Sequence, residues 1–317
     1  MKNVLVTGAA GFLGSHLVDH HLSKGDKVYG VDNFCSSAVS SRHHKALVEH
    51  KNYVFHRQDI TSNVFIQTHA AIHFDLIYNF ACPASPPIYQ SIPIETTMTC
   101  VVGTNSALSL ASNDTVLVHA STSEVYGDPM IHPQPESYWG CVNSYGPRAC
   151  YDEGKRAAEA LCYDHRHKRG IDARVVRIFN TYGPRMDPHD GRVVTNLISQ
   201  ALSGQPMTMY GNGNQTRSFC YVDDLIRGVV ALSQLDKNPE TPINIGNPNE
   251  FTIKQLALKV QERLGGTIDH HVLPKDDPRQ RRPDITLAKK ILNWEPHISL
   301  DIGLDKTIDY VRSLREQ

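Results

Sequence analysis

The sequence predicts an α/β protein built on a doubly wound parallel sheet, with a smaller C-terminal α/β lobe that holds the substrate. Short runs rich in Val, Ile and Leu alternate with segments of helical periodicity through the first two-thirds of the chain. Several of these apolar runs end in a polar or glycine-bearing turn. This alternation is typical of βαβ units, in which helices cover both faces of a parallel sheet. Ligands of such sheets collect at the carboxyl ends of the strands.

Six apolar runs are predicted to be strands because they are short and rich in β-branched and aromatic residues. They lie at residues 2–8, 27–32, 53–59, 75–81, 115–121 and 173–180. Helical periodicity followed by a glycine predicts helices at residues 14–25 and 151–170. A further helix with small and apolar faces is expected at about residues 98 to 112.

The C-terminal part of the chain differs in composition, because Gly, Pro, Asn and Arg are frequent there. Two amphipathic helices are predicted within it, at residues 252–266 and 299–314. We therefore expect residues 1–180 to form the sheet domain, with interleaved segments to about residue 240. Residues 181–317 are expected to form mainly the smaller lobe, which closes over the edge of the sheet.

Composition and charge exclude several classes of function. The formal net charge is −1 and the pI is near 7.0, so we expect no nucleic acid and no membrane surface as a partner. No apolar run approaches about 18 residues and a predicted strand begins at once, so a cytoplasmic location is expected. The seven cysteines include no CxxC pair and are expected to be reduced, buried thiols. The 17 histidines lack partners at metal-ligand spacing, so we expect no metal site.

A glycine-rich turn follows the first predicted strand, in VTGAAGFLGSHL. Gly8, Gly11 and Gly14 allow a tight turn and a close approach of the backbone to a pyrophosphate at the N-terminus of the next helix. Asp32 closes the second strand, where its carboxylate can accept hydrogen bonds from both adenine-ribose hydroxyls and would repel a 2′-phosphate. Asp59, which ends the third strand, is placed to meet the adenine amino group. These residues predict a Rossmann-like domain that binds NAD rather than NADP.

The GxxGxxG spacing resembles that of the extended branch of the short-chain dehydrogenase/reductase superfamily, whose members act on sugar nucleotides. The resemblance implies further residues around the cofactor. They are Phe12, Leu13, Asn33, Phe34, Ser36, Ile60, Phe80, Ala81, Cys82, Thr99, Ala120 and Thr181.

A tyrosine–lysine pair supports this resemblance. Tyr151 is the only one of the 13 tyrosines with a lysine four residues later, Lys155, and the two share one face of a helix. Lys155 and an oxidised nicotinamide would favour the phenolate and lower its pKa, so that Tyr151 can take a proton from a sugar hydroxyl. Thr122, at the tip of the fifth strand, would hydrogen-bond the same sugar oxygen. The three residues look like the catalytic triad of the superfamily and predict an enzyme. The remote alternative to an enzyme is a non-catalytic NAD-binding protein.

The segment STSEVYG distinguishes three related chemistries. Dehydratases of this branch resemble STDEVYG, in which the Asp protonates a leaving hydroxyl, whereas here Ser123 stands at that position. Relatives that are 4-epimerases usually lack an acid at the position of Glu124. A decarboxylase needs no leaving-group acid, because a ketone at C4 makes the C6 carboxylate of a glucuronic acid a β-keto acid. The sequence therefore favours a decarboxylase, with a 4,6-dehydratase or a 4-epimerase as the alternatives.

Longer segments resemble UDP-glucuronate decarboxylases over almost the entire chain, among them ACPASPPIYQSIP, GPRACYDEGKRAAE, RIFNTYGPRM and DDPRQRRPDI. The resemblance implies conversion of UDP-glucuronate to UDP-xylose through a 4-keto intermediate, with bound NAD recycled, in a homodimer. It implies that Glu124 acts near C5 and C6 and that Arg281 anchors the substrate. Arg281 is preferred for this role over its neighbours Arg279 and Arg282. Further substrate contacts are expected at Ser85, Tyr89, Asn105, Ser123, Asn180, Arg185, Arg192, Tyr210, Gln215 and Arg217.

Overall fold

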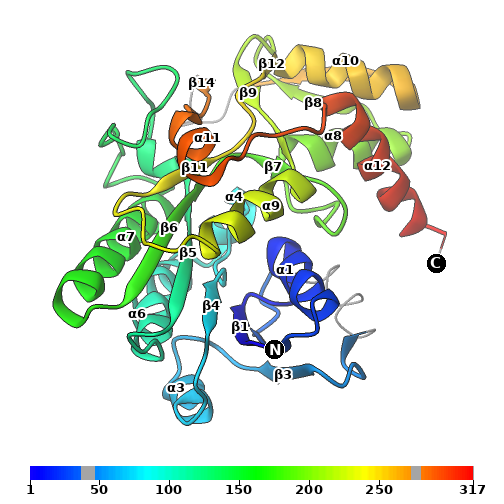
Figure 1. Ribbon diagram of the computed structural model, residues 1–317. Helices are drawn as coiled ribbons and strands as arrows, with labels where there is room; N and C mark the ends of the chain where they lie inside the picture. Colours follow the sequence, from blue (N-terminus) through cyan, green and yellow to red (C-terminus); the bar gives the residue numbers. More distant parts are fainter. Residues whose placement is uncertain (37–46, 273–279, 317) are drawn as a thin grey trace.

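Within residues 1–36, 47–272 and 280–316, which the computed structural model describes, seven parallel strands form a central sheet (Figure 1). The strands are β1 (Asn3–Thr7), β2 (Lys27–Asp32), β3 (Tyr53–Arg57), β4 (Leu76–Asn79), β5 (Val116–Thr122), β6 (Asp172–Ile178) and β11 (Ile243–Ile245). They are covered by α1 (Phe12–Ser23), α3 (Asn63–His69), α6 (Thr104–Ser109), α7 (Ala149–Arg169) and α9 (Val222–Ser233). The order across the sheet is β11-β6-β5-β4-β1-β2-β3. Because the order reverses between β1 and β4, the carboxyl ends of these two strands flank the crevice where such sheets bind ligands.

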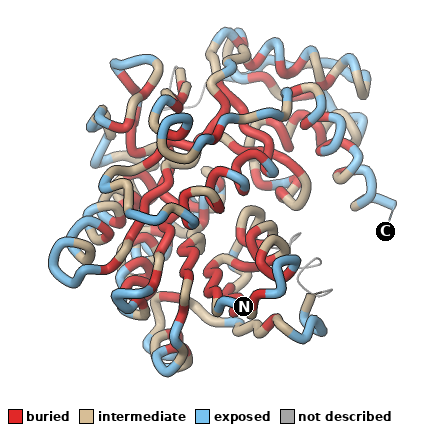
Figure 2. The backbone as a smooth tube through the Cα atoms, viewed as in Figure 1, coloured by how far each residue is buried: buried red, intermediate tan, exposed pale blue. Residues whose placement is uncertain are grey.

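Successive side chains of each strand point to opposite faces, and each face has its own apolar core. Val4 and Val6 of β1 belong to a cluster that includes buried residues of α1 and α9. Leu5, between them, belongs to a second cluster with residues of α3, α6 and α7. Figure 2 shows the buried positions gathered along the strands and the inward sides of these helices. The sheet is therefore covered on both faces, as the sequence predicts.

The smaller lobe shares its core with one face of the sheet. It contains α8 (Val193–Leu202), α10 (Ile253–Leu264), α12 (Leu300–Ser313), the paired strands β8 (Met207–Tyr210) and β13 (Ile268–His271), and β9 (Thr216–Ser218) between β12 (Glu250–Thr252) and β14 (Gln280–Arg281). Leu256 of α10 and Ile308 of α12 belong to the same apolar cluster as Val6. The two parts of the chain are thus joined by continuous packing.

Shorter elements connect these layers. They are α4 (Pro86–Ser91), α5 (Pro93–Met98), the π-helical turn η1 (Thr99–Gly103), the 3₁₀ turn η2 (Ser123–Tyr126), the paired strands β7 (Thr181–Tyr182) and β10 (Cys220–Tyr221), and α11 (Thr286–Leu292).

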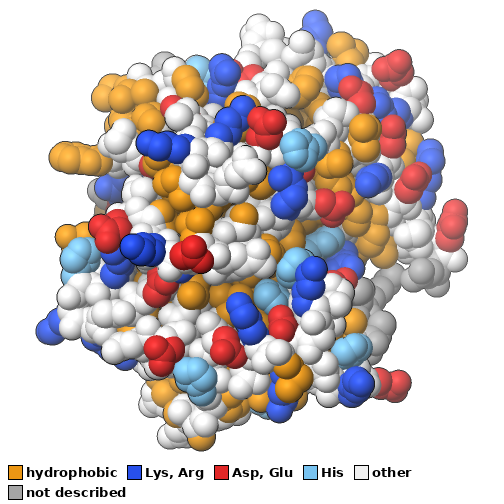
Figure 3. All heavy atoms as spheres, viewed as in Figure 1, with side chains coloured by type: hydrophobic (Ala, Val, Ile, Leu, Met, Phe, Trp, Pro, Cys, Tyr) orange, Lys and Arg blue, Asp and Glu red, His pale blue; other side chains and the backbone are white. Residues whose placement is uncertain are grey.

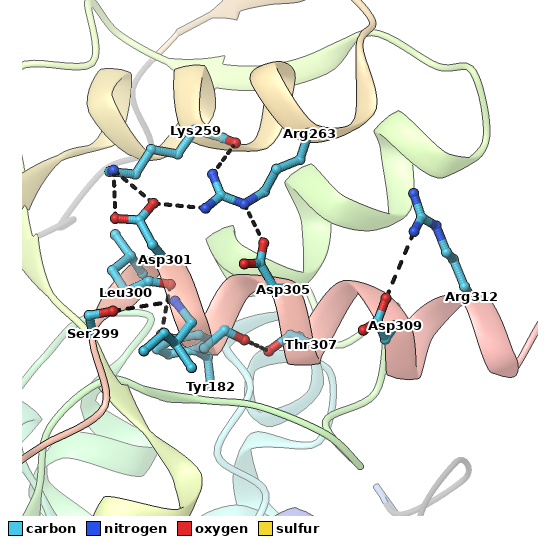
Figure 4. Close-up of polar contacts among 12 residues, drawn as sticks. Tyr182, Lys259, Arg263, Ser299, Leu300, Asp301, Asp305, Thr307, Asp309 and Arg312 are labelled. Atoms are coloured by element: carbon cyan, nitrogen blue, oxygen red, sulfur yellow. Dashed lines mark hydrogen bonds and ion pairs between the residues drawn. The ribbon is translucent and has the colours of Figure 1, made fainter.

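Ion pairs hold α10 to α12 on the outer side of the smaller lobe (Figure 4). Lys259 Nζ donates to both carboxylate oxygens of Asp301 at 2.9 Å. Arg263 donates to Asp301 at 2.8 Å and to Asp305 at 2.6 Å. The hydrogen bond from Lys259 and then that from Arg263 outweigh desolvation and lower the pKa of Asp301. One guanidinium therefore bridges two carboxylates on successive turns of the facing helix.

All six predicted strands are present in the structure, and α10 and α12 occupy the two predicted amphipathic segments. The capping box between Thr252 and Gln255 begins α10 as its sequence suggests. The seventh strand, β11, lies at Ile243–Ile245, so the chain returns to the sheet beyond residue 240. A strand of three residues is too short to stand out as an apolar run. The expected helix near residues 98 to 112 is interrupted by the π-helical turn η1.

Three expectations about side chains have different outcomes. The expectation that the thiols are buried is confirmed for Cys100, Cys162 and Cys220, whereas Cys82 and Cys150 are half-buried. It is wrong for Cys35 and Cys141, which lie exposed in loops. Among the described residues, no group of three or more His, Cys, Asp or Glu side chains is placed to hold a metal ion. The histidine pair at residues 43–44 lies outside the described residues.

None of the described helices combines the length and the apolar character that a bilayer crossing requires. On the face of the molecule drawn in Figure 3, basic and acidic side chains are interspersed. That mixture agrees with the formal net charge of −1.

Candidate active site

A cavity of about 680 Å³ opens at the carboxyl ends of the strands. Its wall includes the turn after β1, the loop after β4, the tip of β5, the first turns of α7, and β9 and β14 of the smaller lobe. The cavity lies at the reversal of strand order between β1 and β4. It is therefore where an open parallel sheet binds its ligands, and it is bounded by both parts of the chain.

The glycine turn forms one end of this cavity. Gly8 has a φ of +71°, and a Cβ placed on it would lie 2.9 Å from the backbone of Phe80 and Ala81. A Cβ on Gly14 would lie 1.9 Å from the carbonyl oxygen of Gly8. Both positions therefore need glycine for the close contact of α1 with the turn. Gly11 caps the N-terminus of α1, which gives the cavity the positive end of a helix dipole.

Two aspartates extend this end of the cavity. Asp32 accepts hydrogen bonds from the backbone N–H groups of Ala10 at 3.0 Å and Phe34 at 2.8 Å, one on each carboxylate oxygen. Its carboxylate is fixed at the cavity wall. Burial disfavours the charged form of Asp59, but hydrogen bonds from Thr61 and Asn33 outweigh it and lower the pKa of that carboxyl. A glycine cradle at a helix N-terminus followed by a fixed acid fits a dinucleotide with a free ribose.

Tyr151, Lys155 and Thr122 meet at the centre of the cavity. Lys155 Nζ donates to the carbonyl oxygen of Ala120 at 2.8 Å and lies 5.9 Å from the centroid of the Tyr151 ring. Thr122 Oγ1 accepts from the backbone N–H of Glu124 at 3.2 Å and is also hydrogen-bonded to the Tyr151 phenol. The helical spacing and the tip of β5 therefore bring together the three residues that the sequence predicts as a triad.

Without a cofactor, burial raises the pKa of Tyr151 well above its ordinary value, the nearby Cys82 thiol adds to the rise, and the hydrogen bond with Thr122 opposes it. The Lys155 ammonium is also held by Ala120 and attracts the Cys82 thiol. The lowering of this pKa was expected from Lys155 together with the positive charge of an oxidised nicotinamide, and for that complex it stays a prediction.

Glu124 lies beside this triad in a cluster of arginines. Its Oε2 accepts from Arg148 at 2.7 Å and pairs with Arg281 at 3.4 Å. Desolvation opposes ionisation, but the charges of Arg281, Arg148 and Arg217 dominate and lower the pKa of Glu124 to about 2. Glu124 is therefore a carboxylate at neutral pH, able to orient a water by accepting a hydrogen bond from it.

The structure describes two of the three arginines of the RQRR segment, and they occupy different positions. Arg281 lines the cavity and is 2% exposed, and its guanidinium donates to the carbonyl oxygens of Ser123 and, at 2.9 Å, Gly127. Arg282 pairs with Glu250 at 3.6 Å and does not line the cavity. Arg279 lies outside the described residues. Arg281 thus ties β14 of the smaller lobe to the segment that carries Glu124.

Most of the residues predicted for the cofactor and the substrate line this one cavity. On the cofactor side they are Gly8, Gly11, Phe12, Leu13, Gly14, Asp32, Asn33, Ser36, Asp59, Ile60, Phe80, Ala81, Cys82, Thr99, Ala120, Tyr151, Lys155 and Thr181. On the substrate side they are Ser85, Tyr89, Ser123, Glu124, Asn180, Arg185, Arg192, Tyr210, Gln215, Arg217 and Arg281.

The structure does not bring Phe34 and Asn105 to the cavity wall. The Phe34 ring lies 5.5 Å from that of Phe55. Asn105 is exposed on α6, and its Oδ1 is hydrogen-bonded to His165 at 3.0 Å. The π-helical turn η1 precedes Asn105, and its extra residue turns the following face by about 100° relative to a continuous α-helix.

Arg148 is a cavity residue that the sequence analysis missed. It stands three residues before Tyr151, and residues three or four apart share a helix face, so helical periodicity could have placed it on the cavity face. Its Nε lies 3.9 Å from the carboxylate of Asp152, which is 7% exposed. Desolvation and then repulsion from Glu124 raise the pKa of Asp152 to about 7. Arg148 therefore lies between two acids of different proton affinity.

Comparison with known sequences gives a consistent set of relatives. A family model described as GDP-mannose 4,6 dehydratase matches residues 5–307. The chain is 48% identical to UDP-glucuronic acid decarboxylase 1 of Xenopus tropicalis over 314 residues, which cover 98% of this chain and 72% of that protein. It is also 48% identical to UDP-glucuronic acid decarboxylase 3 of Arabidopsis thaliana over 305 residues, covering 95% of this chain and 86% of that protein.

Solved structures with the same architecture include two with bound NAD. The UDP-glucuronic acid 4-epimerase of Bacillus cereus, in complex with UDP-glucuronic acid and NAD, has a TM-score of 0.87 at 29% identity, covering 98% of this chain and 99% of that one. The dTDP-glucose 4,6-dehydratase of Bacillus anthracis, in complex with NAD, has a TM-score of 0.86 at 26% identity, covering 100% of this chain and 98% of that one.

Proposed function

This chain belongs to the UDP-glucuronic acid decarboxylases within the GDP-mannose 4,6 dehydratase family, and we propose that it converts UDP-glucuronate to UDP-xylose and carbon dioxide. The sugar is oxidised at C4, loses its C6 carboxylate, is protonated at C5 and is reduced again at C4. The glycine turn, Asp32 and Asp59 would hold NAD, which would supply the two-electron acceptor for C4 and the hydride for its later reduction. The alternatives, a dehydratase and an epimerase of the same fold, make different products from the same type of intermediate.

Tyr151 is the proposed acid and base at C4. Its phenolate takes the proton of the C4 hydroxyl during oxidation and returns it during reduction. The Thr122 hydroxyl, already hydrogen-bonded to the phenol, would donate to the same sugar oxygen and stabilise the enolate left by decarboxylation. Lys155, fixed by the carbonyl oxygen of Ala120, keeps a positive charge beside the phenol ring.

The observation that carries the choice of reaction is the ionised state of Glu124 beside Ser123. Removal of water from a hexose needs a group that donates a proton to the departing hydroxyl. Glu124, with a pKa of about 2 between Arg148 and Arg281, is a carboxylate, and Ser123 carries no acid. Loss of carbon dioxide needs no proton donor, because the bonding electrons move toward the C4 oxygen. The pair therefore suits decarboxylation better than dehydration.

Glu124 also has a proposed role in the protonation of C5. After carbon dioxide has left, C5 must gain a proton, and a carboxylate can hold a water in position to supply it. The arginine pairs of Glu124 fix the direction of its carboxylate and oppose its own protonation. Glu124 would then act by orienting the water and accepting a hydrogen bond from it. The water would give one proton to C5, and the hydroxide that remains would take up a proton from the solvent.

We also propose that the protein acts in the cytoplasm as a homodimer. The sequence resemblance implies pairing through α7 and the segment at about residues 98 to 112, and we place the adjoining α5 in the same interface. The proposal is supported by exposed apolar side chains on this side, Ile94 and Met98 of α5 and Tyr163 of α7, which are 74%, 47% and 62% exposed. A Met98→Glu variant should halve the molar mass measured by light scattering. An unchanged dimer would place the interface elsewhere.

The reaction can be tested by incubating the protein with UDP-glucuronate and NAD. Release of carbon dioxide and formation of a UDP-pentose, followed by mass spectrometry, is the expected result. A product of unchanged mass would identify an epimerase instead, and a product lighter by one water would identify a dehydratase. Tyr151→Phe should lower turnover by about 10²-fold or more while NAD remains bound. Turnover like that of the unaltered protein would refute the part assigned to Tyr151.

A further inference from the structure

Two thiols lie close together beside the triad. Cys82 follows β4 and lines the cavity, and Cys100 is buried in the π-helical turn η1. Their sulfur atoms are 3.4 Å apart, within hydrogen-bond distance for sulfur. The two residues are 18 positions apart in the sequence and come from different elements. Neither thiol has a part in the reaction proposed above.

The surroundings make the two thiols unequal. The hydrogen bond from Cys100 lowers the pKa of Cys82 to about 7, burial opposes this, and the Lys155 ammonium adds to the lowering by its charge and by a hydrogen bond. The same hydrogen bond and burial raise the pKa of Cys100. Cys82 is therefore the more readily ionised thiol of the pair, with Cys100 hydrogen-bonded to it. Thiolates, rather than thiols, are the nucleophiles in oxidation.

We propose that Cys82 and Cys100 form an oxidative modification site, in which hydrogen peroxide that enters the cavity converts the thiol pair to a disulfide. The Cys82 thiolate attacks one peroxide oxygen, the O–O bond breaks, and the departing hydroxide takes up a proton and leaves as water. Cys82 is then a sulfenic acid. The Cys100 sulfur attacks the Cys82 sulfur, the S–O bond breaks, and the hydroxyl leaves with the Cys100 proton as a second water. The two thiols lose two electrons in all, which reduce one peroxide.

The local geometry favours the second step. The two sulfur atoms must approach by only about 1.3 Å to reach bonding distance. Cys82 belongs to the loop between β4 and α4, so a small shift of this loop can supply the approach. Cys100 is more tightly fixed, because α7 packs against it. A Cβ on Gly154 of α7 would lie 3.0 Å from Cys100 Cβ and 3.1 Å from its Sγ.

We expect the disulfide to affect the triad by changing the surroundings of Lys155. A disulfide removes the thiolate that attracts the Lys155 ammonium, and it pulls on the loop whose Phe80 and Ala81 contact the glycine turn. We expect oxidation to lower turnover at least fivefold, with recovery after reduction by dithiothreitol. This effect on turnover rests on the proposed function, whereas formation of the cross-link does not.

The test is peptide mapping of the full chain, treated with hydrogen peroxide and analysed by mass spectrometry without reduction. A peptide pair linked through Cys82 and Cys100 is expected, and it should form before oxidation of the exposed Cys141 is complete. In a Cys100→Ala variant the link should be absent and Cys82 should be trapped as a sulfenic acid by dimedone. A Cys141→Ala variant serves as the control and should give the same link as the unaltered chain.

Two results would overturn the proposal. One is oxidation of Cys141 without any link between Cys82 and Cys100. The other is a link from Cys82 to Cys150, which is the other half-buried thiol nearby. If the link forms and no substrate is decarboxylated by the reduced protein, the modification site stands and the proposed function fails.

Discussion

The rings of Tyr89 and Tyr151 are stacked, with centroids 4.9 Å apart and an angle of 4° between their planes. Tyr89 belongs to α4 in the proline-rich loop segment, and Tyr151 to the first turn of α7. Both residues are at most 7% exposed, so the stack restricts the orientation of the phenol that is proposed to exchange a proton with the sugar. The proline-rich segment therefore positions the base as well as forming part of the cavity wall.

The first prediction concerns this stack. Tyr89→Leu should lower kcat by about tenfold, because the Tyr151 ring loses its flat neighbour and its fixed orientation. Tyr89→Phe keeps the ring and should lose less activity than Tyr89→Leu. Turnover and the Kd for UDP, measured on both variants, separate orientation of Tyr151 from loss of nucleotide binding. Equal losses in the two variants would mean that the Tyr89 hydroxyl, and not the stack, is what matters.

The second prediction concerns Glu124. Glu124→Gln should lower kcat by about 10²-fold, because a neutral amide between two arginines cannot stand in for the carboxylate. Burial is outweighed by the arginine charges, which hold the pKa of Glu124 near 2, so protonation of Glu124 should produce no acid limb above pH 4 in the rate profile. Rates of carbon dioxide release between pH 4 and 9 test both statements. Glu153→Gln, on the same stretch of α7 as Tyr151, is the matched control and should keep most of the activity.

The third prediction concerns Asp152 and stability. Burial, followed by repulsion from Glu124, raises the pKa of Asp152 from 3.8 to about 7. Between these values the folded chain holds a proton that the unfolded chain has released, so the free energy of unfolding should fall as the pH rises from about 4 to 7. The Asp152→Asn variant has no group that ionises at this position, so its free energy of unfolding should not fall in this way. The variant should be roughly 2 to 4 kcal/mol more stable than the unaltered chain at pH 8.

Denaturation at pH 4 and pH 8 checks the prediction for Asp152. The greater stability of the Asn variant should disappear at pH 4, where residue 152 is uncharged in both folded proteins. Asp164→Asn alters an exposed residue of the same helix and should show no such difference between the two pH values. An Asn variant that is less stable than the unaltered chain at pH 8 would show that Asp152 is a net stabilising anion.

The fourth prediction concerns the ion pairs between α10 and α12. Arg263→Met should lower the free energy of unfolding by about 1 kcal/mol at low salt, because one guanidinium serves both Asp301 and Asp305 in a half-exposed setting. The difference should shrink in concentrated salt, which screens exposed charges. Arg312→Met is the control, since Arg312 meets a single acid, Asp309, at 3.8 Å. A loss that is independent of salt would point to packing of the Arg263 stem instead.

Local signals in the sequence were sufficient for much of the site. The turn after β1 could be predicted because Gly8 and Gly14 permit contacts that a side chain would block. The pair of Tyr151 and Lys155 could be predicted because a continuous α-helix fixes their spacing. Arg148 precedes Tyr151 by three residues, which also share a helix face, so its place in the cavity was available from the sequence although it was not inferred.

Other features depend on context that the sequence does not display. Asn105 was expected at the cavity, but the π-helical turn before it changes the face on which it lies. The raised pKa of Tyr151 depends on burial by residues from α4 and β5, which are distant in the chain. The arginine cluster around Glu124 draws Arg281 from β14 and Arg148 from the start of α7. The approach of Arg281 from β14 follows from the fold, and no local pattern in the sequence encodes it.

The position of β11 has a consequence during synthesis of the chain. β6 pairs with β5 along one edge and with β11, at Ile243–Ile245, along the other. A nascent polypeptide that has reached only β6 therefore presents an open row of amide and carbonyl groups, together with apolar surface that α9 later covers. The ribosome must add more than sixty further residues before that edge is closed. Until then the growing protein is exposed to mispairing, and this stretch of translation is where a chaperone would be of most use to it.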